Sequence, residues 1–335
     1  MKKIAAYAKL LRLPGIGGLG TTTLIGALTV GVYDVFDLFI VFLVGSFSAV
    51  YGFLLNDYAD VELDNLVDDL KKKPLVSGDI SKRSALLIGI FLILITFFLI
   101  SILYYEKPID TNKLIAISCI ILAGILGSIY DLYGKRIIGS DFLVSISMSL
   151  VFLFGALSFG QPTIITWIII FILTFNQTLH MNAVEGGIKD ADHDYKMGVT
   201  NIALSSGVKV DKTTLFIPNS FKTFGFGIRL FSVVLLFLPF VFFGYSYYLW
   251  QIILLAVLTF ILIVLSVKFL TMKIFDRSKI RKSIGIQSFL RYSLVPIMLI
   301  PIIGTIPSVI IIIFPIVWYI IFTPLLGEEM FKPRM

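Results

Sequence analysis

Long apolar stretches recur along the whole chain, separated by polar connections. They cover residues 13–33, 38–55, 85–105, 114–130, 142–160, 163–184, 228–246, 249–270, 286–303 and 306–323. A helix of about 20 apolar residues crosses the ~30 Å hydrocarbon core of a bilayer, and most of these stretches approach that length. The pattern therefore predicts an all-α integral membrane protein with several transmembrane helices.

The composition excludes a soluble globular protein. Hydrophobic residues make up 58% of the 335 residues, whereas soluble domains contain roughly 45–50%. The mean hydropathy is +0.97, so too few polar residues remain to cover a water-exposed surface. Proline residues within 286–323 argue against one continuous helix there, because proline removes a backbone donor. We therefore predict two shorter spans that meet near Gly304.

The connections fall into two classes. The short ones cover 34–37, 106–113, 161–162, 247–248 and 304–305, and the long polar ones cover 56–84, 131–141, 185–227 and 271–285. The net charge is +7, and nearly all lysine and arginine residues lie at the N-terminus or beside the long connections. Positive residues stay on the cytoplasmic side. We therefore predict a multi-pass protein of the cell membrane with its N-terminus and long loops in the cytoplasm, forming one domain, 1–335.

The first apolar stretch follows several basic residues, as in a signal peptide, but no small-residue cleavage site follows it, so we expect a retained helix. The only cysteine is Cys119 and the only histidines are His180 and His193. These numbers exclude an internal disulfide and a histidine-rich zinc site. We predict the lipid bilayer as a partner, and no nucleic acid.

A first acidic motif follows the second apolar stretch. Asn56, Asp60 and Asp64 are spaced at i, i+4 and i+8, which places them on one helix face, and Asp57 lies near that face. Neighbouring carboxylates repel one another unless a cation lies between them. Oxygen ligands favour Mg²⁺ or Mn²⁺. A solvated helix end is the alternative for this motif taken alone.

A second acidic motif follows the sixth stretch, where Asp190 and Asp194 are again at i and i+4. Four stretches separate the two motifs, which suggests duplication of a four-helix unit. Two such motifs could hold magnesium around a diphosphate, because Mg²⁺ prefers a few carboxylates together with phosphate oxygens. Basic residues accompany the motifs and could stabilise a diphosphate leaving group. They are Lys73, Lys135, Arg136 and Lys189.

Four segments, in this order, resemble the UbiA family of intramembrane prenyltransferases. Asn56, Asp60 and Asp64 match its first aspartate-rich motif, and Asp190 with Asp194 resembles the second. Residues 73–78, Lys-Pro-Leu-Val-Ser-Gly, are similar to the Arg-Pro-Leu-x-x-Gly that follows the first motif. Residues 130–136, from Tyr130 to Arg136, resemble the tyrosine-to-lysine element after the fourth helix. The resemblance extends over residues 12 to about 290.

This resemblance implies nine core transmembrane helices, so stretch 306–323 would be an additional helix. It implies Mg²⁺-dependent transfer of a prenyl group from a polyprenyl diphosphate, such as geranylgeranyl diphosphate, to a hydrophobic acceptor. Asp60, Asp64, Asp190 and Asp194 would be the catalytic metal ligands together with Asn56. The implied substrate-binding residues are Asn56, Asp57, Lys73, Tyr130, Lys135, Arg136 and Lys189. Lysine at position 73, where arginine is usual, removes a bidentate phosphate contact.

The sequence does not decide among four acceptors. They are an aromatic ring (as in quinone biosynthesis), a glycerol ether phosphate (as in archaeal lipid synthesis), a tetrapyrrole alcohol and a phosphoribose. Two other classes are less favoured. A cation transporter binds its ions near the membrane midplane, whereas both motifs lie at predicted helix ends. A phospholipid-forming phosphotransferase would carry Asp-Gly-x-x-Ala-Arg, which the sequence lacks.

Overall fold

The computed structural model describes residues 2–66, 68 and 70–325, and nearly all of its elements are helical. The first half contains α1 (Lys2–Leu10), α2 (Leu13–Thr29), α3 (Val35–Ala59), α4 (Val61–Asp64), α5 (Lys82–Leu103), α6 (Thr111–Tyr133), η1 (Gly134–Arg136) and α7 (Asp141–Leu157). Then follow η2 (Ile165–Ile170), α8 (Phe171–Leu179), η3 (His180–Gly186), α9 (Gly187–Lys189), α10 (Ala191–Lys196) and α11 (Ile202–Ser205). The last elements are β1 (Lys209–Asp211), β2 (Thr214–Phe216), α12 (Asn219–Phe242), α13 (Leu249–Leu270), α14 (Arg277–Met298), α15 (Ile300–Ile303) and α16 (Thr305–Leu325).

Every predicted apolar stretch lies on a helix, so the all-α membrane class is confirmed. Among the described residues, 7 helices are long and apolar enough to span a bilayer. The last two stretches are separate helices, α14 and α16, with α15 between them and Gly304 at a positive φ of 86°. The count of nine core helices and the four-helix duplication stay predictions.

The chain forms two compact units, which are described separately. The first comprises the described residues within 2–132, 150–162 and 313–325. In it α2, α3 and α5 pack together, and small residues bring the backbones close. Helix α7 approaches α2 closely as well, since a Cβ atom added to Gly155 of α7 would lie 2.1 Å from the carbonyl oxygen of Thr23 in α2. Trp318 ties α16 to this unit, because its indole donates a hydrogen bond to the carbonyl oxygen of Leu13 at 2.8 Å.

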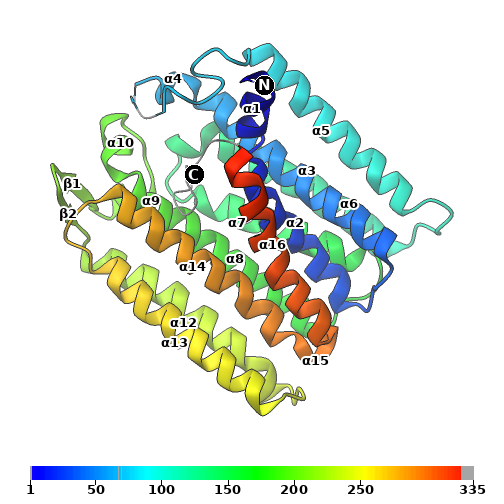
Figure 1. Cartoon of the computed structure of the whole chain (residues 1–335). Helices are drawn as coiled ribbons and strands as arrows, with labels where there is room; N and C mark the ends of the chain where they lie inside the picture. The colour runs from blue at the N-terminus through cyan, green and yellow to red at the C-terminus, as the bar shows by residue number, and fades with distance from the viewer. Residues whose placement is uncertain (1, 67, 69, 326–335) are drawn as a thin grey trace. The chain divides into compact units, whose positions relative to one another are not determined.

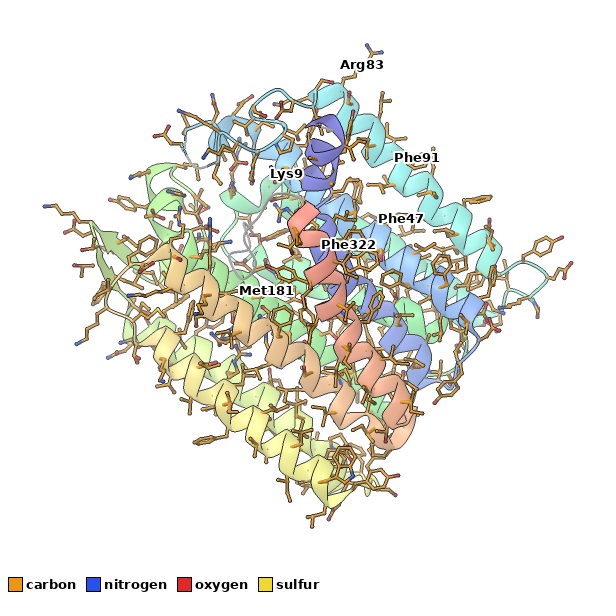
Figure 2. The ribbon with its side chains drawn as sticks, in the orientation of Figure 1. Lys9, Phe47, Arg83, Phe91, Met181 and Phe322 are labelled. Atoms are coloured by element: carbon orange, nitrogen blue, oxygen red, sulfur yellow. The ribbon has the colours of Figure 1, made fainter. Side chains whose placement is uncertain are left out.

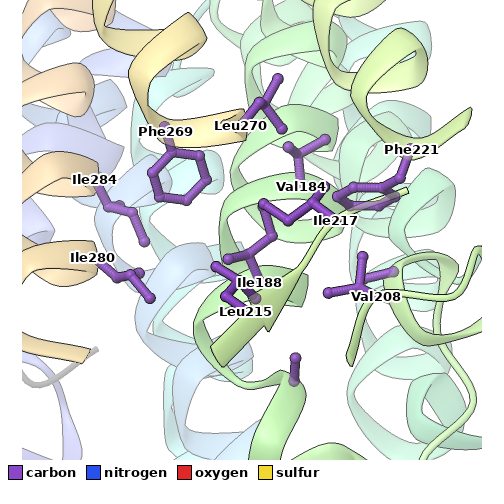
Figure 3. Close-up of a cluster of buried hydrophobic side chains, with 12 residues drawn as sticks. Val184, Ile188, Val208, Leu215, Ile217, Phe221, Phe269, Leu270, Ile280 and Ile284 are labelled. Atoms are coloured by element: carbon purple, nitrogen blue, oxygen red, sulfur yellow. The ribbon is translucent and has the colours of Figure 1, made fainter. Parts of the chain in front are cut away.

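The second unit comprises residues 133–149 and 163–312. Helices α12, α13 and α14 lie side by side in it (Figure 1). Figure 3 shows a cluster of buried apolar side chains at one end of these helices. Val184 and Ile188, on the helix that leads to the second acidic motif, pack there against Phe221, Phe269 and Ile284. The segment that carries the second motif is therefore part of the packed core.

Several predicted boundaries in the 185–227 connection were wrong. The helix continues through Glu185 to Lys189, and α12 begins at Asn219 rather than at residue 228. Residues 219–227 are polar or glycine at many positions, so hydropathy alone does not reveal this first part of α12. Between these helices β1 and β2 pair as an antiparallel hairpin, so much of residues 205–227 forms regular secondary structure.

The outer flank of α5 displays large apolar side chains. Figure 2 shows Phe91 pointing away from this flank and Arg83 projecting from the end of the helix. Phe91 is 60% exposed, and many other apolar residues of α5 are exposed as well. Such a surface is unsuited to water but matches the hydrocarbon of a bilayer.

Candidate active site

The first acidic motif lies where α3 ends and α4 begins. The amide of Asp60 donates to the carbonyl of Asn56 at 3.0 Å, and the amide of Asp64 donates to that of Asp60 at 2.8 Å. The helical turns thus continue through the motif, and the three side chains share one face. Asp60 and Asp64 are only 6% and 2% exposed. Glu62, on the opposite face, has a side chain that is 91% exposed.

Two basic residues neutralise part of this buried charge. The guanidinium of Arg12 contacts Asp57 Oδ1 at 3.0 Å. The ammonium of Lys73 lies 2.9 Å from Asp57 Oδ1 and 2.7 Å from Asp64 Oδ2. A buried carboxylate is stable only with such partners. Asp57 thus holds Arg12 and Lys73 beside the motif. Arg12 was not among the predicted site residues, because a basic residue before the first helix is ordinary in membrane proteins.

The loop that carries Lys73 is held by packing. Leu75 and Ile80 are buried in an apolar cluster with Leu10 and Leu54. The amide of Ile80 donates to the carbonyl of Pro74 at 3.0 Å and closes the loop. Gly78 has a φ of 79°, which glycine adopts without strain. This loop explains why the Lys-Pro-Leu-Val-Ser-Gly segment places its lysine beside Asp64.

Both cations stay charged near neutral pH. Burial opposes the charge of Lys73, but the carboxylates of Asp57 and Asp64 outweigh it and raise the pKa of Lys73 above its usual 10.5. Burial likewise opposes the charge of Arg12, but Asp57 above all, together with Asp131 and Asp64, raises the pKa of Arg12 above its usual value. The first motif therefore combines fixed positive and negative charges.

The end of α6 adds a further carboxylate to the first unit. A Cβ atom added to Gly52, one turn before Asn56, would lie 3.7 Å from Asp131 Oδ2. Asp131 therefore lies against α3 beside the first motif, next to the predicted Tyr130. Asp131 was not among the predicted site residues. Its position directly after Tyr130, at the end of a predicted helix, was the one sequence feature that could have marked Asp131 as a candidate.

The second acidic motif spans the junction of α9 and α10. The amide of Asp194 donates to the carbonyl of Asp190 at 2.9 Å, so the i, i+4 turn is present. Asp190 contacts the ammonium of Lys189 at 3.3 Å. Asp194 Oδ2 accepts a hydrogen bond from the side-chain amide of Asn201 at 2.8 Å. Two of the predicted residues, Lys189 and Asp190, are thus in contact.

Arg277 fixes the other face of this motif. Its guanidinium contacts Asp192 Oδ1 at 2.5 Å and the carbonyl oxygen of Lys189 at 3.4 Å. It also lies 3.0 Å from His193 Nε2. Burial and the charge of Arg277 lower the pKa of His193, so a neutral ring accepts this hydrogen bond. Asp192 thus points to the start of α14. It lies on a different face of the motif from Asp190 and Asp194, the two predicted metal ligands.

Lys135 and Arg136 form the short helix η1 in the second unit. The carbonyl oxygen of Lys135 accepts a hydrogen bond from the amide of Thr200 at 2.9 Å. This bond attaches η1 to the segment that follows the second motif. Arg136 is exposed. The residue after Thr200 is Asn201, whose side chain donates a hydrogen bond to Asp194. The backbone contact therefore places Lys135 near Asn201.

The donor atoms of both motifs suit a hard divalent cation. They are carboxylate and amide oxygens, which Mg²⁺ prefers together with phosphate oxygens. Among the residues that the structure describes, no group of three or more His, Cys, Asp or Glu side chains is arranged to hold a metal ion. In the first motif Lys73 already contacts Asp64 and Asp57. The residues present therefore fit magnesium bound with a phosphate-bearing substrate better than a closed protein-only site.

Long apolar helices, with buried and ion-paired carboxylates at the end of one of them, define an integral membrane protein. The model of the UbiA prenyltransferase family matches residues 19–295. The chain therefore belongs to this family, and it is an intramembrane prenyltransferase.

Relatives and solved structures agree with this assignment. A 4-hydroxybenzoate octaprenyltransferase of Shewanella pealeana is 30% identical over 61% of this chain and 69% of its own length. A digeranylgeranylglyceryl phosphate synthase structure has a TM-score of 0.61 at 21% identity, covering 90% of this chain and 98% of that one. A UbiA homologue of Archaeoglobus fulgidus bound to DMAPP and Mg²⁺ has a TM-score of 0.61 at 17% identity, covering 86% and 98%.

Proposed function

We propose that the protein transfers a prenyl group from a polyprenyl diphosphate to an aromatic acceptor within the membrane, with Mg²⁺ as cofactor. The observation that carries this proposal is the first acidic motif. Asp57, Asp60 and Asp64 are buried together at a helix end, with Arg12 and Lys73 bound to them. This combination suits a diphosphate held by a divalent cation.

Magnesium would be held by the oxygen-bearing residues of the two motifs and would supply positive charge to the diphosphate. These residues are Asn56, Asp60, Asp64, Asp190 and Asp194. Lys73, Lys135, Arg136 and Lys189 would bind phosphate oxygens, and Tyr130 is a further proposed substrate-binding residue. Asp57 acts differently, because its two ion pairs fix Arg12 and Lys73.

The bond changes determine what these residues must do. The bond between C1 of the prenyl group and the diphosphate oxygen breaks, and its electron pair leaves with the diphosphate. The acceptor carbon then bonds to C1 and loses a proton, so the products are prenylated acceptor, pyrophosphate and a proton. Charge grows on the leaving diphosphate, and preorganised cations such as Lys73 stabilise that charge in the transition state. Surrounding apolar helices exclude water, which would otherwise react with the allylic cation.

The aromatic acceptor is proposed because relatives are named 4-hydroxybenzoate octaprenyltransferases. The competing acceptor is a glycerol ether phosphate, in view of the digeranylgeranylglyceryl phosphate synthase fold. Radiolabelled geranylgeranyl diphosphate incubated with either acceptor distinguishes them. We expect label in 4-hydroxybenzoate, and exclusive labelling of the glycerol ether would replace the aromatic assignment.

Donor binding is expected to depend on magnesium through the head group alone. The purified protein should bind a non-hydrolysable geranylgeranyl thio-diphosphate at least about 10-fold more tightly with Mg²⁺ than with a chelator, because the cation offsets carboxylate–phosphate repulsion. Geranylgeraniol, with the same tail, should show little response. Isothermal titration of both ligands under both conditions measures the difference. Equal affinities throughout would contradict the proposed function.

We also propose that both motifs face the cytoplasm, as the lysine and arginine distribution indicates. With Cys119 replaced by alanine, single cysteines at Glu62 and Asp211, both exposed, should react with an impermeant thiol reagent only from the cytoplasmic side. Tyr105, 73% exposed in the α5–α6 connection, is the control and should react only from the other side. Labelling of Glu62→Cys and Asp211→Cys from opposite sides would contradict the orientation.

A further inference from the structure

A buried polar network lies in the second unit, just before the second acidic motif. Glu185 makes a two-pronged ion pair with Arg291, in which Nη1 contacts Oε1 and Nη2 lies 3.0 Å from Oε2. Arg229 Nη2 lies 3.5 Å from Glu185 Oε1 and 3.0 Å from His180 Nδ1. Gln287 Oε1 accepts from Arg229 at 3.3 Å. All five side chains are buried.

This network holds an unusual piece of helix. Residues His180–Gly186 form the π-helix η3, in which hydrogen bonds run from i to i+5. His180 Nδ1 and Glu185 Oε1 lie 3.3 Å apart although they are five residues apart in sequence. In an α-helix residues five apart differ by roughly 140° around the axis and could not meet. The contact of Glu185 with His180 therefore requires the π form.

The π form determines the direction of the residues that follow. A π segment accommodates about one extra residue relative to an α-helix, and each residue of an α-helix turns the chain by about 100°. If η3 relaxed to α geometry, the following residues would rotate by about 100° around the helix axis. Asp190 and Asp194 would then point elsewhere, and Asp192 would lose Arg277.

We propose that Glu185 is a positioning residue for the second acidic motif. Its ion pair with Arg291 and its contacts with His180 and Arg229 hold η3 in the π form, and this sets the direction of Asp190 and Asp194. The relevance of that direction to catalysis rests on the proposed function, in which these two aspartates bind magnesium diphosphate. The positioning itself rests on the contacts of Glu185.

The direction of the motif can be measured without substrate. In a cysteine-free background (Cys119→Ala), Asp192→Cys and Arg277→Cys place two thiols at positions whose native side chains touch. A short bismaleimide should join them readily. Glu185→Gln is expected to lower the cross-linking rate at least about 5-fold, because a rotation of roughly 100° separates the two positions. Glu185→Asp, which keeps the charge, should recover part of that rate.

Asp37→Asn is the matched control. Asp37 forms an ion pair with Lys107 in the first unit. The substitution makes the same carboxylate-to-amide change as Glu185→Gln and should leave the cross-linking rate unchanged. If Glu185→Gln does not fold in detergent, Arg291→Lys replaces it, since lysine keeps the charge but not the two-pronged contact. Unchanged cross-linking in a folded Glu185→Gln or Arg291→Lys protein would overturn the proposal.

A second measurement separates this inference from the proposed function. With native Asp192 and Arg277, Glu185→Gln should raise the Mg²⁺ concentration needed for half-maximal binding of geranylgeranyl thio-diphosphate about 10-fold, because misdirected carboxylates bind the cation poorly. Reduced cross-linking together with an unchanged magnesium requirement would leave Glu185 as a positioning residue. The same result would remove Asp190 and Asp194 from the metal site.

Discussion

Replacing Asp60 or Asp190 with alanine is expected to lower turnover by on the order of 10²-fold or more while leaving the protein folded. Each would remove one oxygen ligand from magnesium diphosphate, so charge on the leaving group would be less well stabilised. A 10²-fold loss corresponds to about 2.7 kcal/mol of transition-state stabilisation. Transfer of radiolabelled prenyl groups by purified variants, with thermal unfolding as a check on folding, measures the effect.

Two exposed carboxylates provide controls for these substitutions. Glu62 lies between Asp60 and Asp64 in sequence, but its side chain is 91% exposed and its nearest cation is 3.8 Å away. Asp211 is exposed on the hairpin of the second unit. Glu62→Ala and Asp211→Ala should change turnover less than about twofold, since exposed ion pairs contribute little. Comparable losses in Glu62→Ala and Asp60→Ala would refute the assignment of helix faces.

The sequence was sufficient for the fold class and for the positions of the long apolar helices. Hydropathy identifies a helix in a bilayer because lipid-facing side chains must be apolar and backbone groups must be paired within the segment. The i, i+4 spacing similarly predicted the turns that join Asn56, Asp60 and Asp64, because such turns depend on local geometry.

Residues that act through distant partners could not be found in the same way. Arg12 and Asp57 are 45 residues apart, and Arg291 and Glu185 are 106 apart, so no local pattern links them. Glu185 was placed at the start of a polar loop, yet it is fully buried. A carboxylate in a polar run resembles a solvated one until the chain folds and brings a guanidinium to it.

The π geometry of η3 was equally invisible in the sequence. Apolar periodicity separates helix from strand, but one extra residue in a turn changes the pattern too little to detect. The start of α12 at Asn219 was missed for a related reason. Pro218 precedes the first turn of α12, and Phe221 and Gly225 are buried on its inner face. The asparagine, serine, lysine, threonine and glycine residues of 219–227 lower the mean hydropathy of this stretch, so hydropathy does not reveal the turn.

Replacing Lys73 with methionine is expected to lower kcat/KM for the prenyl diphosphate by on the order of 10²-fold. The ammonium of Lys73 contacts both Asp57 and Asp64. Methionine would remove this positive partner from two buried carboxylates. The repulsion between these carboxylates and a diphosphate would then increase. Lys73→Arg should recover most of the activity, because arginine is usual at this position in the family that the motif resembles and keeps the charge. Steady-state kinetics with varied donor at saturating Mg²⁺ measure both variants.

The pH dependence gives this prediction a second test. The pKa of Lys73 is raised above 10.5 by Asp57 and Asp64 despite burial. The stability that its ion pairs contribute is therefore complete below pH 10.5 and is lost only as the pH rises through the raised value. Between pH 6 and 9 the ratio of wild-type to Lys73→Arg activity should stay constant, because both side chains remain charged. A step in that ratio within this range would show that Lys73 loses its proton near neutral pH. Lys73 would then be neutral at these pH values, and its proposed electrostatic contact with the diphosphate would be lost.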